Sequence, residues 1–158
     1  MSAELKTYAQ EIRWILDQIS RTVDGLTEQQ INWRPSIGTA NSAYAIASHV
    51  VGCTRVYALG FGCGQTVIRD RSAEFAASGS STQDLVAALQ QLADEITTAL
   101  DTLTPATLNE RFRPAQELWG TGQAREISRR EALVECIRHA ALHLGELRLT
   151  RDLARQDV

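Results

Sequence analysis

Apolar residues recur at helical spacing along four long segments of the chain, and no segment alternates convincingly with the period of a β-strand. Each segment is roughly 20 residues long, which corresponds to a helix of about 30 Å. Four amphipathic helices of similar length are typical of a four-helix bundle. The sequence therefore predicts an all-α bundle whose helices cover about residues 3–23, 42–60, 82–103 and 129–154.

Polar residues at the ends of these segments match known helix caps. Ser128 with Glu131 has the spacing of a capping box and begins the last helix, while Asp24-Gly25 ends the first. A second capping box, Thr27 to Gln30, predicts one short helical turn that Pro35 ends. The caps expected for the second and third helices are Asn41 or Ser42 and Ser81 or Thr82.

The sequence also predicts the structure of two segments between the helices. Residues 110–127 have no persistent period, and we interpret them as a long ordered connection before the last helix. The charged triplet Arg69-Asp70-Arg71 is typical of a solvated loop. Trp33, Phe112 and Trp119 lie outside the long helices, where they either roof a pocket or plug an end of the bundle. No linker or repeat divides the chain, so residues 1–158 are expected to form one domain.

Composition excludes several classes of function. The net charge is −3, so no basic excess is present to bind a nucleic-acid phosphate backbone. No apolar run reaches the ~18 residues of a membrane span, and the first residues lack the apolar core of a signal peptide. Three cysteines in a chain of this length do not form a disulfide framework. We therefore expect a soluble cytoplasmic protein with no nucleic-acid or membrane partner.

The chain has only three histidines, and their placement predicts a metal site. His139 and His143 are four residues apart, so both lie on one face of the last helix and can reach one ion. His49 lies midway along the second helix, whose other residues are mostly apolar. Burying an imidazole without partners is costly, and a facing helix of a bundle can bring it to the histidine pair. The alternative is three separate core histidines.

Neighbours of the histidines leave open which groups complete the site. Glu146 shares the face of His139 and could be a ligand, an orienting partner, a general base or the partner of an arginine. Cys53 and Cys136 lie one turn from a histidine; either could bind a soft metal, although free cysteines are more often core residues. Gly52, on the His49 side, could make room for a ligand or a helix contact, and Gly145 could permit close helix packing.

These features resemble those of the DinB-like superfamily of four-helix-bundle proteins. The resemblance covers nearly the whole chain and depends on segment 26–35 (LTEQQINWRP), His49, and segment 139–147 (HAALHLGEL). It implies a divalent metal held by His49, His139 and His143, although Glu146 stands where the family often has Gln. Zinc, nickel, cobalt and iron all suit three imidazoles with an open position, so the metal stays undecided.

The resemblance also implies candidate activities. Relatives include S-transferases that use small thiols and an isomerase, so our first hypothesis is a metal-dependent transferase that joins a small-molecule thiol to an electrophilic substrate. The alternatives are a metal-dependent hydrolase and a bundle that binds a metal or small ligand without catalysis. Family members often pair through bundle helices, and the second helix is apolar nearly all round, so we expect a homodimer. No catalytic residue is assigned.

Overall fold

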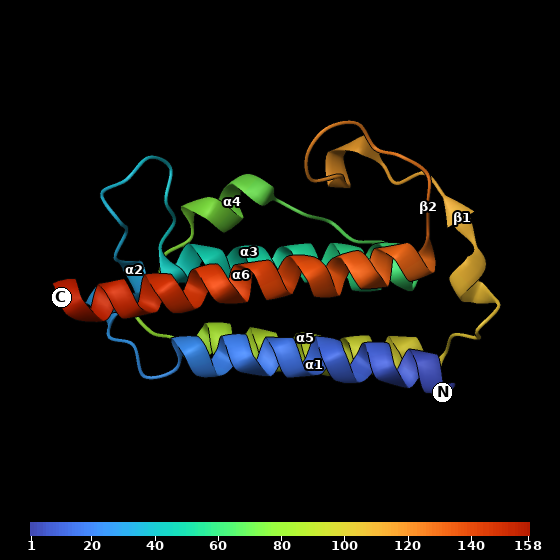
Figure 1. Ribbon diagram of the computed structural model, residues 1–158, viewed down its shortest axis with the longest axis horizontal. Helices are drawn as coiled ribbons and strands as arrows, with labels where there is room; N and C mark the ends of the chain where they lie inside the picture. Colours follow the sequence, from blue (N-terminus) through green and yellow to red (C-terminus); the bar gives the residue numbers. More distant parts are fainter.

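The computed structural model describes residues 1–158 and is dominated by four long helices, which confirms the predicted all-α bundle (Figure 1). The first three are α1 (Ala3–Val23), α3 (Ala43–Thr54), extended by η1 (Arg55–Gly62), and α5 (Gln83–Asp101); the fourth is α6 (Arg129–Asp157). Ser42 caps α3, Thr82 precedes α5, and Ser128 with Glu131 forms the predicted capping box of α6. The short helix α2 (Glu28–Asn32) begins at the predicted Thr27 capping box.

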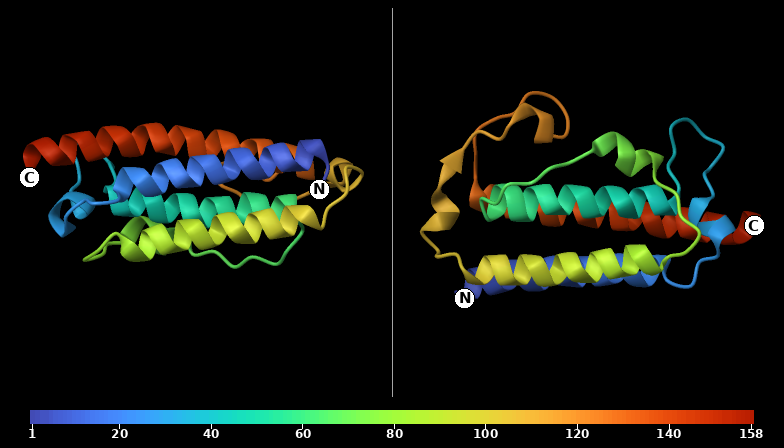
Figure 2. Two further views of the ribbon diagram at one scale, coloured as in Figure 1. Left: turned by 90° about the horizontal axis from the view of Figure 1, so that it is seen from below. Right: turned by 180° about the vertical axis from the view of Figure 1, so that it is seen from behind.

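The long helices lie in two layers, with α1 and α5 side by side in one layer and α3 and α6 in the other (Figures 1 and 2). The helices α1 and α6 run in one direction along the bundle, and α3 and α5 run in the other. Because α3 and α5 are parallel, the chain must return along the bundle between them. Apolar residues from all four helices meet in one core cluster of 34 buried residues.

The returning segment covers the outer side of α3 and includes the short helix α4 (Arg71–Ala76), which packs on α3 (Figure 1). This intramolecular cover accounts for the apolar character of α3 on most faces without a second chain. Asp70 caps α4 by accepting a hydrogen bond from the Ala73 amide, 2.9 Å away. The prediction of a solvated loop is wrong for Arg69, whose side chain is only 4% exposed because it pairs with Glu74 of α4.

The second long helix differs from the expected regular α-helix in its last eight residues. Segment η1 is a π-helix, a wider form in which each amide bonds five residues back. Its end, Gly62, lies against α6, where a Cβ would be 2.6 Å from Leu133 Cδ2. The wide turns place Tyr57 and Phe61, both buried, on the side of the last connection.

The connection between α5 and α6 is ordered, as predicted. It contains η2 (Thr107–Asn109), β1 (Arg111–Phe112), η3 (Gln116–Leu118) and β2 (Ile127–Ser128), and the two short strands pair antiparallel. Phe112 and Trp119 pack on Phe61 at ring distances of 5.9 and 6.5 Å, so they close this end of the bundle. None of the helices is both long and apolar enough to cross a membrane.

Candidate metal centre

The three histidines meet in one cluster between α3 and α6. The ring centroid of His49 lies 5.2 Å from that of His139 and 4.9 Å from that of His143. The rings of His139 and His143 are 4.5 Å apart, as their spacing on one helix face predicts. The hypothesis of three unrelated core histidines is therefore wrong, and the three imidazoles can act on one bound species.

One ring nitrogen of His49 is occupied by a carboxylate from α4. His49 Nδ1 lies 2.9 Å from Glu74 Oε2, and both side chains are nearly buried. Arg69 clamps the same carboxylate, with Nε and Nη2 donating to Oε1 and Oε2 at 2.7 Å each. Burial by itself would raise the pKa of Glu74, but the Arg69 and His49 hydrogen bonds outweigh it and lower that pKa. Glu74 is therefore an ionised acceptor, and the His49 tautomer with its proton on Nδ1 can donate to it and leave the Nε2 lone pair for a ligand.

Two further contacts fix the position of this imidazole. Phe75, next to Glu74 on α4, stacks on the His49 ring at 4.5 Å with an angle of 24°. At Gly52, a Cβ would lie 1.8 Å from Glu74 Oε1, so only glycine leaves room for the carboxylate. We expected the space at Gly52 to be taken by a ligand or a helix contact. It is filled instead by the Glu74 side chain.

His143 has a similar carboxylate partner on its own helix. Its Nδ1 lies 2.7 Å from Glu146 Oε2, and this hydrogen bond is the main cause of the lowered pKa of Glu146. Of the roles considered for Glu146, the structure supports that of an orienting partner rather than the partner of an arginine. Gly145 does not lie against a neighbouring helix, since no atom is within 4 Å of a Cβ placed there, and the packing expectation is wrong.

His139 lies beside a thiol. Its Nε2 is 3.6 Å from Cys53 Sγ, and burial together with His143 and His49 lowers the pKa of His139 to about 4. Burial raises the pKa of Cys53 to about 11, so the protonated thiol donates to a neutral imidazole. Cys136 is fully enclosed in the core cluster and belongs to the packing, not to the site.

This donor set fits a divalent transition metal. Ligand atoms of His49, Cys53 and His139 all lie within 4.8 Å of one another, and His143 borders the same space through its ring. Metal-bound imidazoles usually donate their other N–H to a carboxylate, which is the arrangement at His49 and His143. The structure thus contains a possible His/Cys/His metal site, and the predicted set of His49, His139 and His143 stays a prediction.

Sequence reasoning missed Arg69, Glu74 and Phe75 as parts of the site. They lie 20 to 26 residues after His49, on a segment with no long apolar period that could place it in space. The one usable signal was Gly52, because a glycine inside a helix marks a position where another group comes close.

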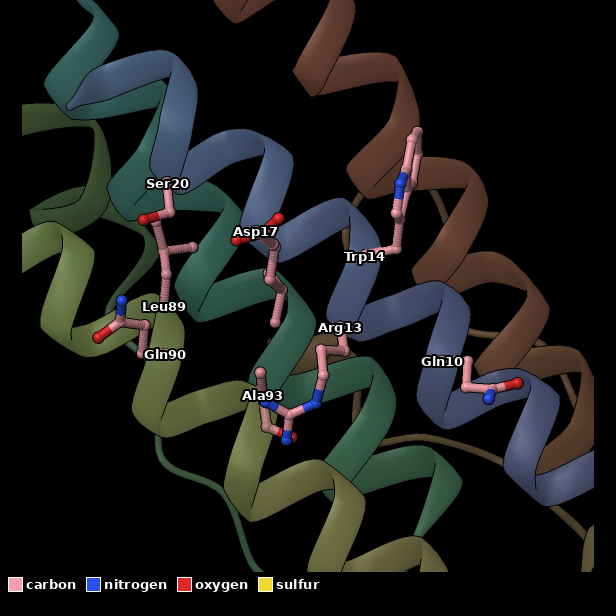
Figure 3. Close-up of a pocket in the computed structure, with 9 residues that line it drawn as sticks. Gln10, Arg13, Trp14, Asp17, Ser20, Leu89, Gln90 and Ala93 are labelled. Carbon is pink, nitrogen blue, oxygen red and sulfur yellow. The ribbon is translucent and has the colours of Figure 1, made fainter.

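A second hollow, in the layer opposite the histidines, does not belong to this site. This groove of about 500 Å³ lies between α1 and α5, and Trp14 is exposed at its edge. Figure 3 shows the side chains that line it. Its arginine, Arg13, is held by Asp94 and Thr97 of α5 at 2.6 and 3.0 Å. We therefore assign the groove no part in the chemistry.

The fold and the histidine cluster define a helical-bundle protein with a candidate metal centre. The model of the DinB superfamily matches residues 11–147, and the chain belongs to this superfamily. Comparison with curated proteins gives no match.

Two solved structures share the fold at low sequence identity. YfiT from Bacillus subtilis, a probable metal-dependent hydrolase with an unusual four-helix-bundle topology, superposes with a TM-score of 0.74 at 16% identity. The match covers 95% of this chain and 87% of YfiT. A DinB-like protein from Bacillus cereus ATCC 10987 gives a TM-score of 0.70 at 14% identity, over 94% of this chain and 91% of that one. These likenesses confirm the fold.

Proposed function

We propose that the protein is a metal-dependent transferase that joins a low-molecular-weight thiol to a small electrophile. The observation that carries the proposal is the convergence of three imidazoles, two of which are oriented by carboxylates. A divalent metal bound by His49, His139 and His143 would supply a Lewis acid that lowers the pKa of a bound thiol. In the net reaction, the sulfur forms a bond to the electrophilic carbon, the leaving group departs with its electron pair, and the thiol proton passes to solvent.

The carboxylates around the site favour a thiol over water as the nucleophile. Glu74 accepts hydrogen bonds from Arg69 and His49, and Glu146 accepts one from His143. Both carboxylates have lowered pKa values and are committed to orienting imidazoles, so neither is free to act as a general base. A thiol needs such a base less than water does, because its own pKa is about 8.5 and that of water about 15.7.

Hydrolysis of an ester or amide is the second candidate. It is supported by the shared fold with YfiT, a probable metal-dependent hydrolase. The same donor set suits either reaction, because the Lewis acid would act on water as it acts on a thiol.

The experiment that tests the proposal incubates the metal-reloaded wild type and two variants with a panel of cellular thiols and a generic electrophile such as monochlorobimane. We expect conjugation above background in the wild type, its loss in His143→Ala, and its retention in Trp14→Ala as a matched surface control. Cleavage of esters or amides without conjugation would instead support hydrolysis. Absence of both activities would favour a bundle that binds a metal or small ligand without catalysis.

A further inference from the structure

A pocket of about 480 Å³ lies beside the histidine cluster, against the first half of α6. Its walls come from three parts of the chain: Tyr57 of η1, Trp119 of the last connection, and α6 around Val134 and Glu135. A volume of this size suits a small organic molecule. This pocket contains none of the histidines, and nothing in the proposed donor set accounts for it.

Tyr57 forms the boundary between this pocket and the metal centre. Its ring lies 6.4 Å from that of His139 and nearly parallel to it, at 21°. Glu135, on the pocket wall, precedes His139 by one turn of α6. A molecule in the pocket can therefore contact the Tyr57 ring, which neighbours His139.

The apolar part of the pocket is shaped for a flat body. The rings of Tyr57 and Trp119 lie 6.4 Å apart, tilted by 48°, and Ile127 and Val134 add aliphatic walls. Aromatic side chains pack well against planar groups. Val134 is 51% exposed although it is apolar, so it has surface left for a ligand to cover.

Of the three guanidinium groups in the pocket, one makes no hydrogen bond within the protein. Arg130 is bound to Glu4 at 2.6 Å and to Asn109, and Arg138 is bound to Glu135. Arg125 is 67% exposed and has Glu131 Oε1 at 3.9 Å, a distance that allows a weak ion pair but no hydrogen bond. A guanidinium with free donors at the rim of an apolar pocket is suited to a carboxylate.

Tyr57 also carries an unused donor. Its hydroxyl has no hydrogen-bond partner in the protein, and burial raises the pKa of Tyr57 to about 12, so the phenol stays protonated. A polar group on the wall nearest the metal centre can donate to an oxygen of a bound molecule.

We infer that this pocket binds a flat small molecule with a carboxylate, held by Arg125 at one end and packed against the exposed edges of Tyr57 and Trp119. The other end then lies near Tyr57, whose ring neighbours that of His139. The identification of this molecule as substrate rests on the proposed function, whereas its binding does not.

The test measures binding of 2-naphthoate by calorimetry, with 2-naphthamide as a neutral compound of the same shape. We expect naphthoate to bind to both metal-free and metal-loaded protein, and to bind about tenfold more tightly than the amide. Arg125→Gln should remove that preference without weakening the amide, and Trp119→Ala should weaken both compounds. Arg155→Gln, which removes an exposed charge near the far end of α6, and Trp14→Ala are the matched controls and should change neither.

Equal affinities for the two compounds, no binding of naphthoate, or an Arg125→Gln variant that still prefers the carboxylate would overturn the inference. The outcome is separable from that of the proposed function. Thiol conjugation by a wild type that does not bind naphthoate would support the transferase proposal and overturn the pocket inference. Binding with the expected pattern but without any conjugation would support the pocket inference and overturn the transferase proposal.

Discussion

Glu74 Oε1 occupies the place next to Gly52 where any side chain would begin, 1.8 Å from an ideal Cβ. The two residues belong to different elements, α3 and α4, that pack on each other. Their contact brings the carboxylate to His49 on the same helix. The missing side chain at Gly52 is thus a condition for the orientation of a candidate metal ligand.

Replacing Gly52 with Ala should therefore weaken metal binding. The methyl group forces Glu74 away from His49 Nδ1, and loss of such an orienting partner typically costs about 10- to 100-fold in metal affinity. Competition with a chromogenic chelator measures the change. Gly145→Ala is the matched control: no atom of the chain lies within 4 Å of a Cβ there, so metal affinity should be unchanged. An unchanged affinity in Gly52→Ala would contradict the role of Glu74.

Glu74→Gln should lower stability as well as metal affinity. The substitution leaves the buried Arg69 guanidinium without a compensating charge, which costs about 3 kcal/mol in a buried pair. Chemical denaturation of metal-free protein measures this loss. As a control, Glu95→Gln breaks a half-exposed pair with Arg55 and should cost at most about 1 kcal/mol. Equal effects of the two substitutions would show that the Arg69–Glu74 pair contributes no more to the free energy of unfolding than the half-exposed pair does.

The sequence predicts the helices and the histidine cluster because both depend on local spacing. Apolar period and caps place α1, α5 and α6 within a few residues, and the four-residue step between His139 and His143 puts two imidazoles on one face. Facing helices in a bundle then make His49 a natural third member.

The remaining parts of the site depend on contacts between distant segments. Glu74 reaches His49 only because the chain returns along the bundle, and nothing local to residues 69–75 fixes that path. Arg69 in a charged triplet has the composition of a solvated loop, and its burial depends on its partner. The π-helical turns of η1 could not be predicted either. A segment that is apolar on nearly all faces does not show from its sequence whether its turns have 3.6 residues or more.

We predict that the protein forms a homodimer through the exposed face of α6. Leu142 and Leu149, both 62% exposed, lie with Gly145 on one face. Arg138 and Asp152 stand seven positions before and after Gly145, so two antiparallel copies centred there would place opposite charges together. Light scattering should give twice the chain mass, and the double variant Leu142→Glu, Leu149→Glu should dissociate the pair. Ile68→Glu, at an even more exposed loop residue, is the control; a wild-type mass near 17.4 kDa would refute the dimer.

The set of metal ligands is decided by comparing His143→Ala with Cys53→Ala. We predict that His49, His139 and His143 hold the metal, so His143→Ala should lose stoichiometric metal, whereas Cys53→Ala should keep it, because three imidazoles converge on the same space without the thiol. Elemental analysis after reloading gives the stoichiometry, and circular dichroism checks that both variants stay helical. Cobalt-loaded protein adds a spectroscopic test, since a sulfur ligand gives a thiolate-to-cobalt charge-transfer band that three imidazoles do not. Retention of metal in His143→Ala, with its loss and the loss of that band in Cys53→Ala, would instead assign the site to His49, Cys53 and His139, whose ligand atoms lie within 4.8 Å of one another.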